Sequence, residues 1–141
     1  MSGSPKTRAH QVLLVDADIR SGRRLAELLG EDGFEVEMAR DGASAIARLS
    51  RAPAPATLIT ELTVALADGA AIARYGRSLD PSLRVIVLTR HPNLVVPAAF
   101  GSPAPTVFTK PLDYTKLLEL LEEGAKSDSK APGSGVASPV V

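Results

Sequence analysis

The sequence predicts an α/β fold with a doubly wound, five-stranded parallel sheet and helices on both faces. Short apolar runs rich in valine, leucine and isoleucine alternate along the chain with segments whose apolar residues recur at helical spacing. Residues 12–15 and 85–88 are continuously apolar, which is typical of strands buried on both faces. Polar and turn-forming residues separate the segments, as expected for parallel strands joined by helical crossovers.

The strand candidates are short and end in polar residues. In the second of them, Phe34, Val36 and Met38 alternate with glutamates, which indicates an outer strand with one solvated face. The expected strands cover residues 11–15, 34–39, 57–62, 84–89 and 106–109.

The helix candidates follow residues that can cap them. Asp41, Asp68 and Asp113 each stand before a helical pattern, where a carboxylate accepts free backbone N–H groups. The expected helices cover residues 19–29, 42–49, 69–77 and 114–123. Another helix should lie within 91–105, but four prolines there predict that it is short or distorted.

Length and composition narrow the class of protein. A chain of 141 residues suits one domain, which we expect over residues 11–123, with a flexible arm at 1–10 and a disordered Ser/Gly/Pro-rich tail at 124–141. Basic and acidic residues both total 16, and this balance argues against nucleic-acid binding. The sequence has no cysteine, no secretory signal and no membrane-length apolar run, so we expect a cytoplasmic protein without membrane contact.

Polar side chains stand where the predicted strands end. They are Asp16, Asp18, Glu61, Thr89 and Lys110. Because ligands of such sheets bind outside the carboxyl ends of the strands, these side chains should form an acidic pocket with one lysine. Clustered carboxylates favour a cation, which Lys110 or a divalent metal with oxygen ligands would supply.

Five short motifs occur in a characteristic order at this predicted edge. They are Val12–Asp18 (VLLVDAD), Thr60–Leu62 (TEL), Asp68–Gly69, Val87–Thr89 (VLT) and Thr109–Pro111 (TKP). With them the chain resembles the response-regulator receiver domains of two-component systems, over about residues 11–123. The resemblance implies the flavodoxin-like (βα)5 architecture of that family.

The same resemblance implies a role for each position. The acidic pair of the family falls on Asp16 and Ala17, and its phosphoacceptor aspartate on Glu61. Its switch hydroxyl falls on Thr89, and its lysine, before a proline that is often a cis bond, on Lys110. The aromatic switch position of the family falls on Val107, with Phe108 its neighbour. Ala65 stands where the family usually has a proline after the acceptor loop.

Two departures argue against phosphoryl chemistry. Ala17 has no ligand atom where the family's acid binds Mg²⁺, so any metal site on Asp16 and Glu61 should be absent or weak. Glu61 extends the carboxylate by one methylene, about 1.5 Å. Because a misplacement of about 1 Å can lower a rate about 10²-fold, we expect no aspartyl-phosphate-type chemistry here.

Alternatives remain open at single residues. Glu61 either imitates the phosphorylated state in part or is a carboxylate neutralised by Lys110 for stability alone. Asp16 either caps the following helix or pairs with Lys110, and Asp18 is expected as a helix N-cap and not a ligand. Thr89 is either a relic of the switch or a plain strand-end hydroxyl.

The favoured function is a pseudo-receiver, which is not an enzyme and signals by protein–protein interaction without phosphorylation. Its partner would be a histidine kinase, a phosphotransfer protein or a downstream effector, with a homodimer as an alternative. Arg20, Arg23 and Arg24 on the first helix are either a docking patch or a solvated face. The competing hypotheses are a working phosphorelay receiver phosphorylated by a histidine kinase and, disfavoured by the few aromatic residues, a flavodoxin-like enzyme or flavin binder.

Overall fold

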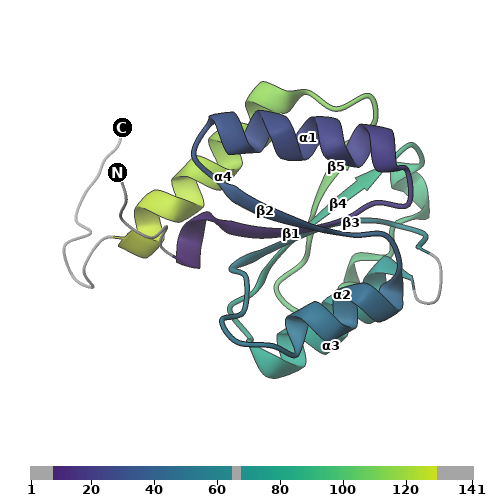
Figure 1. Cartoon of the computed structure of the whole chain (residues 1–141). Helices are drawn as coiled ribbons and strands as arrows, with labels where there is room; N and C mark the ends of the chain where they lie inside the picture. Colours follow the sequence, from purple (N-terminus) through teal and green to yellow (C-terminus); the bar gives the residue numbers. More distant parts are fainter. Residues whose placement is uncertain (1–7, 65–67, 130–141) are drawn as a thin grey trace, which may run out of the picture.

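The computed structural model describes residues 8–64 and 68–129, and it contains the predicted five-stranded parallel sheet (Figure 1). The strands lie in the order β2-β1-β3-β4-β5. Their bounds are β1 Gln11–Val15, β2 Glu35–Ala39, β3 Thr57–Glu61, β4 Arg84–Thr89 and β5 Thr106–Thr109. All pairings are parallel, and β2 is an outer strand as predicted. The α/β fold class is therefore confirmed.

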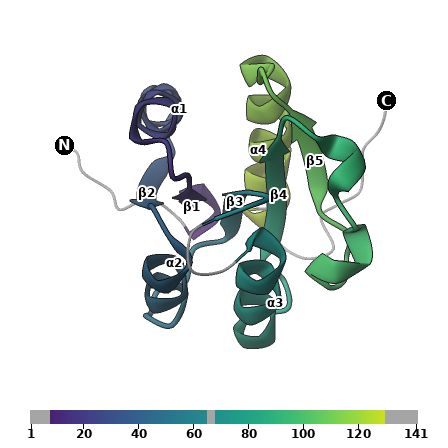
Figure 2. The same ribbon diagram turned by 90° about the vertical axis from the view of Figure 1, so that its right-hand side faces the viewer.

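Four α-helices cover the sheet, with α1 and α4 on one face and α2 and α3 on the other (Figure 2). They are α1 Ile19–Glu31, α2 Gly42–Leu49, α3 Gly69–Leu79 and α4 Tyr114–Ser129. Aspartates begin the first three: the amides of Arg20, Ser44 and Ala71 donate to Asp18, Asp41 and Asp68 at 3.0, 2.8 and 2.7 Å. None of the helices within 8–64 and 68–129 is long and apolar enough to cross a membrane.

Alternate residues of the central strands enter two separate cores. Leu13, Leu58 and Val85 point to the α2/α3 face, where they pack with Leu49, Ile72 and Phe100. Their neighbours Leu14, Ile59 and Ile86 point to the α1/α4 face and pack with Leu29 and Leu117. This two-sided burial is the reason that β1 and β4 are mostly apolar along their length.

The connection from β4 to β5 contains no α-helix. Two short 3-10 segments stand in its place, η2 Pro92–Leu94 and η3 Pro97–Phe100. The predicted distortion is confirmed, because a proline interrupts the hydrogen-bond pattern that a longer helix needs. Phe100 anchors the connection in the core and is 1% exposed.

Ordered structure extends beyond both predicted ends. Residues Arg8–His10 form the 3-10 segment η1, with Ala9 buried, so the arm predicted over 1–10 is wrong there. Likewise α4 continues to Ser129, although a tail was predicted from Gly124. A Cβ on Gly124 would collide with the Arg84 guanidinium, and this close packing outweighs the low helix propensity of glycine. Residues 1–7 and 130–141 lie outside the described residues.

Candidate functional site

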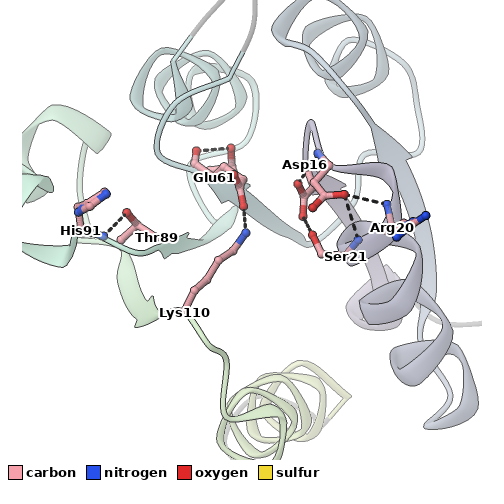
Figure 3. A network of polar contacts seen from close by, with 9 residues as sticks. Asp16, Arg20, Ser21, Glu61, Thr89, His91 and Lys110 are labelled. Carbon is pink, nitrogen blue, oxygen red and sulfur yellow. Dashed lines mark hydrogen bonds and ion pairs between the residues drawn. The ribbon is translucent and has the colours of Figure 1, made fainter.

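The residues predicted to gather at the carboxyl edge of the sheet do lie there (Figure 3). Asp16 directly follows β1, and Glu61 is the last residue of β3. Thr89 is the last residue of β4, and Lys110 directly follows β5. The register of the sheet places these positions together, since Thr60 pairs with Val15 and Thr89 with Thr109.

The central contact of the site is an ion pair between Lys110 and Glu61. The ammonium Nζ donates to the carboxylate Oε2, and the two side chains are 20% and 23% exposed. The backbone amide of Lys110 donates to the carbonyl of Thr89 at 2.8 Å, which holds the lysine beside β4. Of the two roles expected for Glu61, this contact corresponds to a carboxylate neutralised by Lys110.

Asp16 is turned away from Lys110 and toward the start of α1 (Figure 3). Its side chain is nearly inaccessible, at 3% exposure for the residue. One oxygen accepts from the amide of Asp18 at 2.8 Å and the other from Oγ of Ser21 at 3.1 Å. Asp16 therefore organises the entry into α1, and the ion pairs of the described residues do not include one between Asp16 and Lys110.

Asp18 is a helix cap, as predicted. It is exposed, and its Oδ1 accepts from the amides of Arg20 at 3.0 Å and Ser21 at 3.5 Å. These bonds satisfy free N–H groups of the first turn of α1. The same oxygen is thus engaged with the backbone of the helix.

Thr89 and Val107 are the residues expected at the switch positions of the family. The hydroxyl of Thr89 accepts from the amide of His91 at 2.9 Å, and Thr89 is buried. Val107 is half-buried against the α2/α3 core, whereas the neighbouring Phe108 packs into the α1/α4 core. The aromatic ring next to this position therefore lies on the other face of the sheet.

The donor atoms at this edge do not fit a magnesium site. Mg²⁺ demands near-octahedral oxygen coordination, usually with one or two carboxylates. Ala17 offers only a methyl group, both carboxylate oxygens of Asp16 accept hydrogen bonds, and Glu61 is paired with Lys110. Among the described residues, no group of three or more histidine, aspartate or glutamate side chains is arranged to hold a metal ion. Ala65 lies outside the described residues.

Two residues of the site were not predicted from the sequence. Ser21 holds Asp16, and a serine in the first turn of a helix carries no signal that distinguishes it from an ordinary polar residue. Gly69 lets α3 begin against β3: its amide donates to Leu62 O at 3.0 Å, and a Cβ there would lie 2.4 Å from the carbonyl oxygen of Glu61. The sequence predicts that this helix begins at Gly69, but it does not predict the close approach to Glu61.

A hollow of about 460 Å³ lies beside the ion pair, between α1 and the residues that follow β5. Apolar side chains form most of its wall, and Asp16, Ser21, Arg90 and Lys110 contribute polar atoms. The hollow thus shares Asp16 and Lys110 with the candidate site.

Comparisons with known proteins agree with this geometry. Residues 12–122 match the family described as the response regulator receiver domain. A response regulator receiver protein of Anaeromyxobacter sp. (strain Fw109-5) is 32% identical over 109 residues, which are 77% of this chain and 45% of that protein. This chain thus spans less than half the length of that relative. The receiver protein CpdR of Brucella abortus is 27% identical over 114 residues, covering 80% of this chain and 94% of that protein.

Solved structures give the same result. The chemotaxis response regulator CheY4 of Vibrio cholerae is 25% identical with a TM-score of 0.70, covering 81% of this chain and 97% of that one. The signal receiver domain of an HD domain-containing protein from Pseudomonas fluorescens is 25% identical with a TM-score of 0.74, covering 90% and 94%. Fold, site geometry and sequence agree, and the chain belongs to the response-regulator receiver family of two-component signalling.

Proposed function

We propose that this chain is a pseudo-receiver: a cytoplasmic signalling module that acts by protein contact, without catalysis and without accepting a phosphoryl group at the end of β3. One observation carries the proposal. At the position where the family has its phosphoacceptor, Glu61 is paired with the lysine that would otherwise face the phosphoryl group.

The argument rests on what phosphoryl transfer requires. Its catalysis is mostly positioning and neutralisation of charge by metal ions and basic side chains. Here the nucleophile would be one methylene too long, and the neighbouring position that should supply a metal ligand is Ala17. Both defects impair the same step.

The pair also suggests what replaces the phosphoryl signal. A phosphoryl group adds about 1.5–2 negative charges, whereas a glutamate side chain can supply a single charge without any kinase. The contact with Glu61 holds Lys110 toward β3. A constant arrangement of this edge is what a module needs if partner binding does not wait for a kinase.

Two surfaces support protein contact. Arg20, Arg23 and Arg24 are exposed together on α1 and suit an acidic partner surface. Leu94 and Val96 are 60% and 62% exposed on the connection between β4 and β5. The partner classes that we propose are a histidine kinase, a phosphotransfer protein or a downstream effector. A second copy of this chain is the alternative partner.

Acetyl phosphate with Mg²⁺, followed by intact-mass analysis, tests the proposal. The parent protein should show no phosphoryl adduct, whereas the double variant Ala17→Asp/Glu61→Asp should gain one. Glu61→Asp alone separates the effect of the acceptor from that of the metal ligand, and a receiver domain known to accept phosphate serves as the positive control. An adduct on the parent that disappears in Glu61→Gln would establish a working phosphorelay receiver instead.

A further inference from the structure

A second pocket lies at the opposite edge of the sheet from Glu61. It has a volume of about 340 Å³ and lies between the C-terminal part of α3, the start of β4 and the residues that lead into β5. Its walls are mainly apolar, with Leu83, Val85 and Leu120 among them. Two arginines, Arg77 and Arg84, also line it, and none of its described lining residues is acidic.

Arg77 is a buried cation without a carboxylate partner among the described residues. It is 8% exposed, and burial lowers the pKa of its guanidinium. Its Nε donates to Leu83 O at 3.3 Å, and its Nη1 donates to Phe100 O at 3.0 Å and to the carbonyl of Pro103. These acceptors are neutral, and the ion pairs of the described residues do not include Arg77, so no carboxylate contacts its guanidinium directly.

One nitrogen of this guanidinium remains available. Nη2 carries two N–H donors, and no hydrogen bond of the described residues uses them. Among the described residues, Oε1 of Gln11 is the only fully buried side-chain polar atom without a hydrogen-bond partner, so Nη2 of Arg77 is not fully buried. Nη2 is therefore the donor of Arg77 that is left for a ligand, and Arg77 lines the pocket.

We propose that this pocket binds the carboxylate of a small organic acid, with its oxygens on Nη2 of Arg77 and its apolar body against Leu83, Val85 and Leu120. A carboxylate matches the planar guanidinium and supplies the missing charge. The apolar walls favour a monocarboxylate with a hydrocarbon body over inorganic phosphate. Arg84, whose Nη1 donates to Leu120 O at 2.7 Å, also lines the pocket.

Such a ligand would act on the connection that carries Leu94 and Val96. Arg77 joins α3 to Phe100 and Pro103, so an anion on Arg77 strengthens the link between α3 and this connection. The site is remote from the ion pair at the other edge of the sheet. It therefore gives the module an input that does not depend on whether Glu61 accepts phosphate.

Titration of the whole chain with sodium benzoate at constant ionic strength, followed by amide NMR shifts, tests the proposal. We expect saturable binding with one site, and shifts concentrated at Ser82, Thr106 and the residues around Arg77. Benzyl alcohol has the same ring without the charge, and inorganic phosphate has the charge without the ring. Both should bind at least about tenfold more weakly than benzoate.

Two variants locate the site, and a third is their control. Ala104→Trp fills the pocket without altering Arg77, and Ser102→Trp places the same side chain on a neighbouring exposed residue outside the pocket. Ala104→Trp should weaken benzoate binding at least about tenfold, and Ser102→Trp should not change it. Arg77→Lys keeps the charge but loses the planar fork, and a similar loss is expected if this variant folds.

Four results would overturn the proposal. The first three are the absence of saturable benzoate binding to the parent protein, unchanged affinity in Ala104→Trp, and equal binding of benzyl alcohol. Equal binding of benzyl alcohol would show an apolar hollow that does not use the arginine. Phosphate binding as tight as benzoate would overturn the assigned ligand class, because it would show that the apolar walls contribute nothing.

Discussion

Lys110 and Glu61 are 49 positions apart in the sequence, and their side chains form an ion pair that passes over the end of β4 (Figure 3). The strand between them, β4, ends in Thr89, whose carbonyl accepts the amide of Lys110. Three strands are thus tied together at the carboxyl edge by one side-chain contact and one backbone bond.

Removal of one partner of this pair should destabilise the fold. In Lys110→Met, the half-buried Glu61 carboxylate loses its counter-charge, and the free energy of unfolding should fall by about 1–2 kcal/mol. The double variant Lys110→Met/Glu61→Gln should recover part of this loss, with a coupling energy of about 0.5–1.5 kcal/mol from urea denaturation of all four proteins. Strictly additive effects would mean that the pair contributes nothing to stability.

Gly69 should tolerate no side chain. A Cβ would lie 2.4 Å from the carbonyl oxygen of Glu61 and 3.2 Å from Cγ2 of Thr60, so Gly69→Ala forces α3 away from β3. We expect a loss of about 1–3 kcal/mol in the free energy of unfolding, measured by chemical denaturation. Gly30→Ala is the matched control, because nothing lies within 4 Å of a Cβ there. It should be neutral or stabilise α1 by up to about 1 kcal/mol, and equal losses in both variants would refute the steric explanation.

Arg77 should hold the connection between β4 and β5 in place. Arg77→Met removes the donors to Leu83, Phe100 and Pro103, and we expect it to lower the free energy of unfolding by about 2–3 kcal/mol. Arg74→Met is the control, because exposed Arg74 makes one such bond, to Ala99 O at 2.7 Å, and its loss should cost about 1 kcal/mol or less. Hydrogen exchange should accelerate in η3 more in the first variant than in the second; the reverse order would contradict this role.

Tyr114 should make stability fall at high pH. Its hydroxyl donates to Leu28 O at 2.9 Å and to Oδ2 of Asp32 at 2.6 Å. Burial and then the contact with Asp32 raise the pKa of Tyr114 well above its ordinary value of about 10. Above about pH 10 the unfolded chain therefore releases this proton while the folded chain keeps it. Because the unfolded state then binds fewer protons, the free energy of unfolding decreases as pH rises.

The variant Tyr114→Phe checks this dependence. It lacks the titrating hydroxyl, so its stability should be lower than that of the parent protein near neutral pH but should decrease less steeply above about pH 10. Denaturation curves measured between about pH 9 and 11 give the two slopes. Parallel slopes for the two proteins would show that this hydroxyl is not responsible.

The sheet could be predicted because its determinants are local. The strands β1 and β4 are mostly apolar, and aspartates mark the starts of the first three helices. The end of α4 was mispredicted because it depends on a distant residue: Gly124 reads as a helix stop, yet its missing side chain makes room for Arg84. A local pattern contains no information about such a contact.

The site was predictable in its members but not in its pairings. The rule for parallel sheets places Asp16, Glu61 and Lys110 at one edge. Which acid pairs with the lysine depends on the reach and direction of side chains, and the sequence left both open. The burial of Arg77 was also invisible, because an arginine near the end of a helix usually lies in solvent.

The two 3-10 segments between β4 and β5 also bear on binding specificity among signalling proteins. A protein built to grip an α-helix reads side chains spaced by 3.6 residues per turn. In this chain it would meet two 3-10 segments that begin with prolines and have a different side-chain spacing. That mismatch would disfavour such a protein without any repulsive charge. Selectivity at this connection would thus follow from the shape of the backbone.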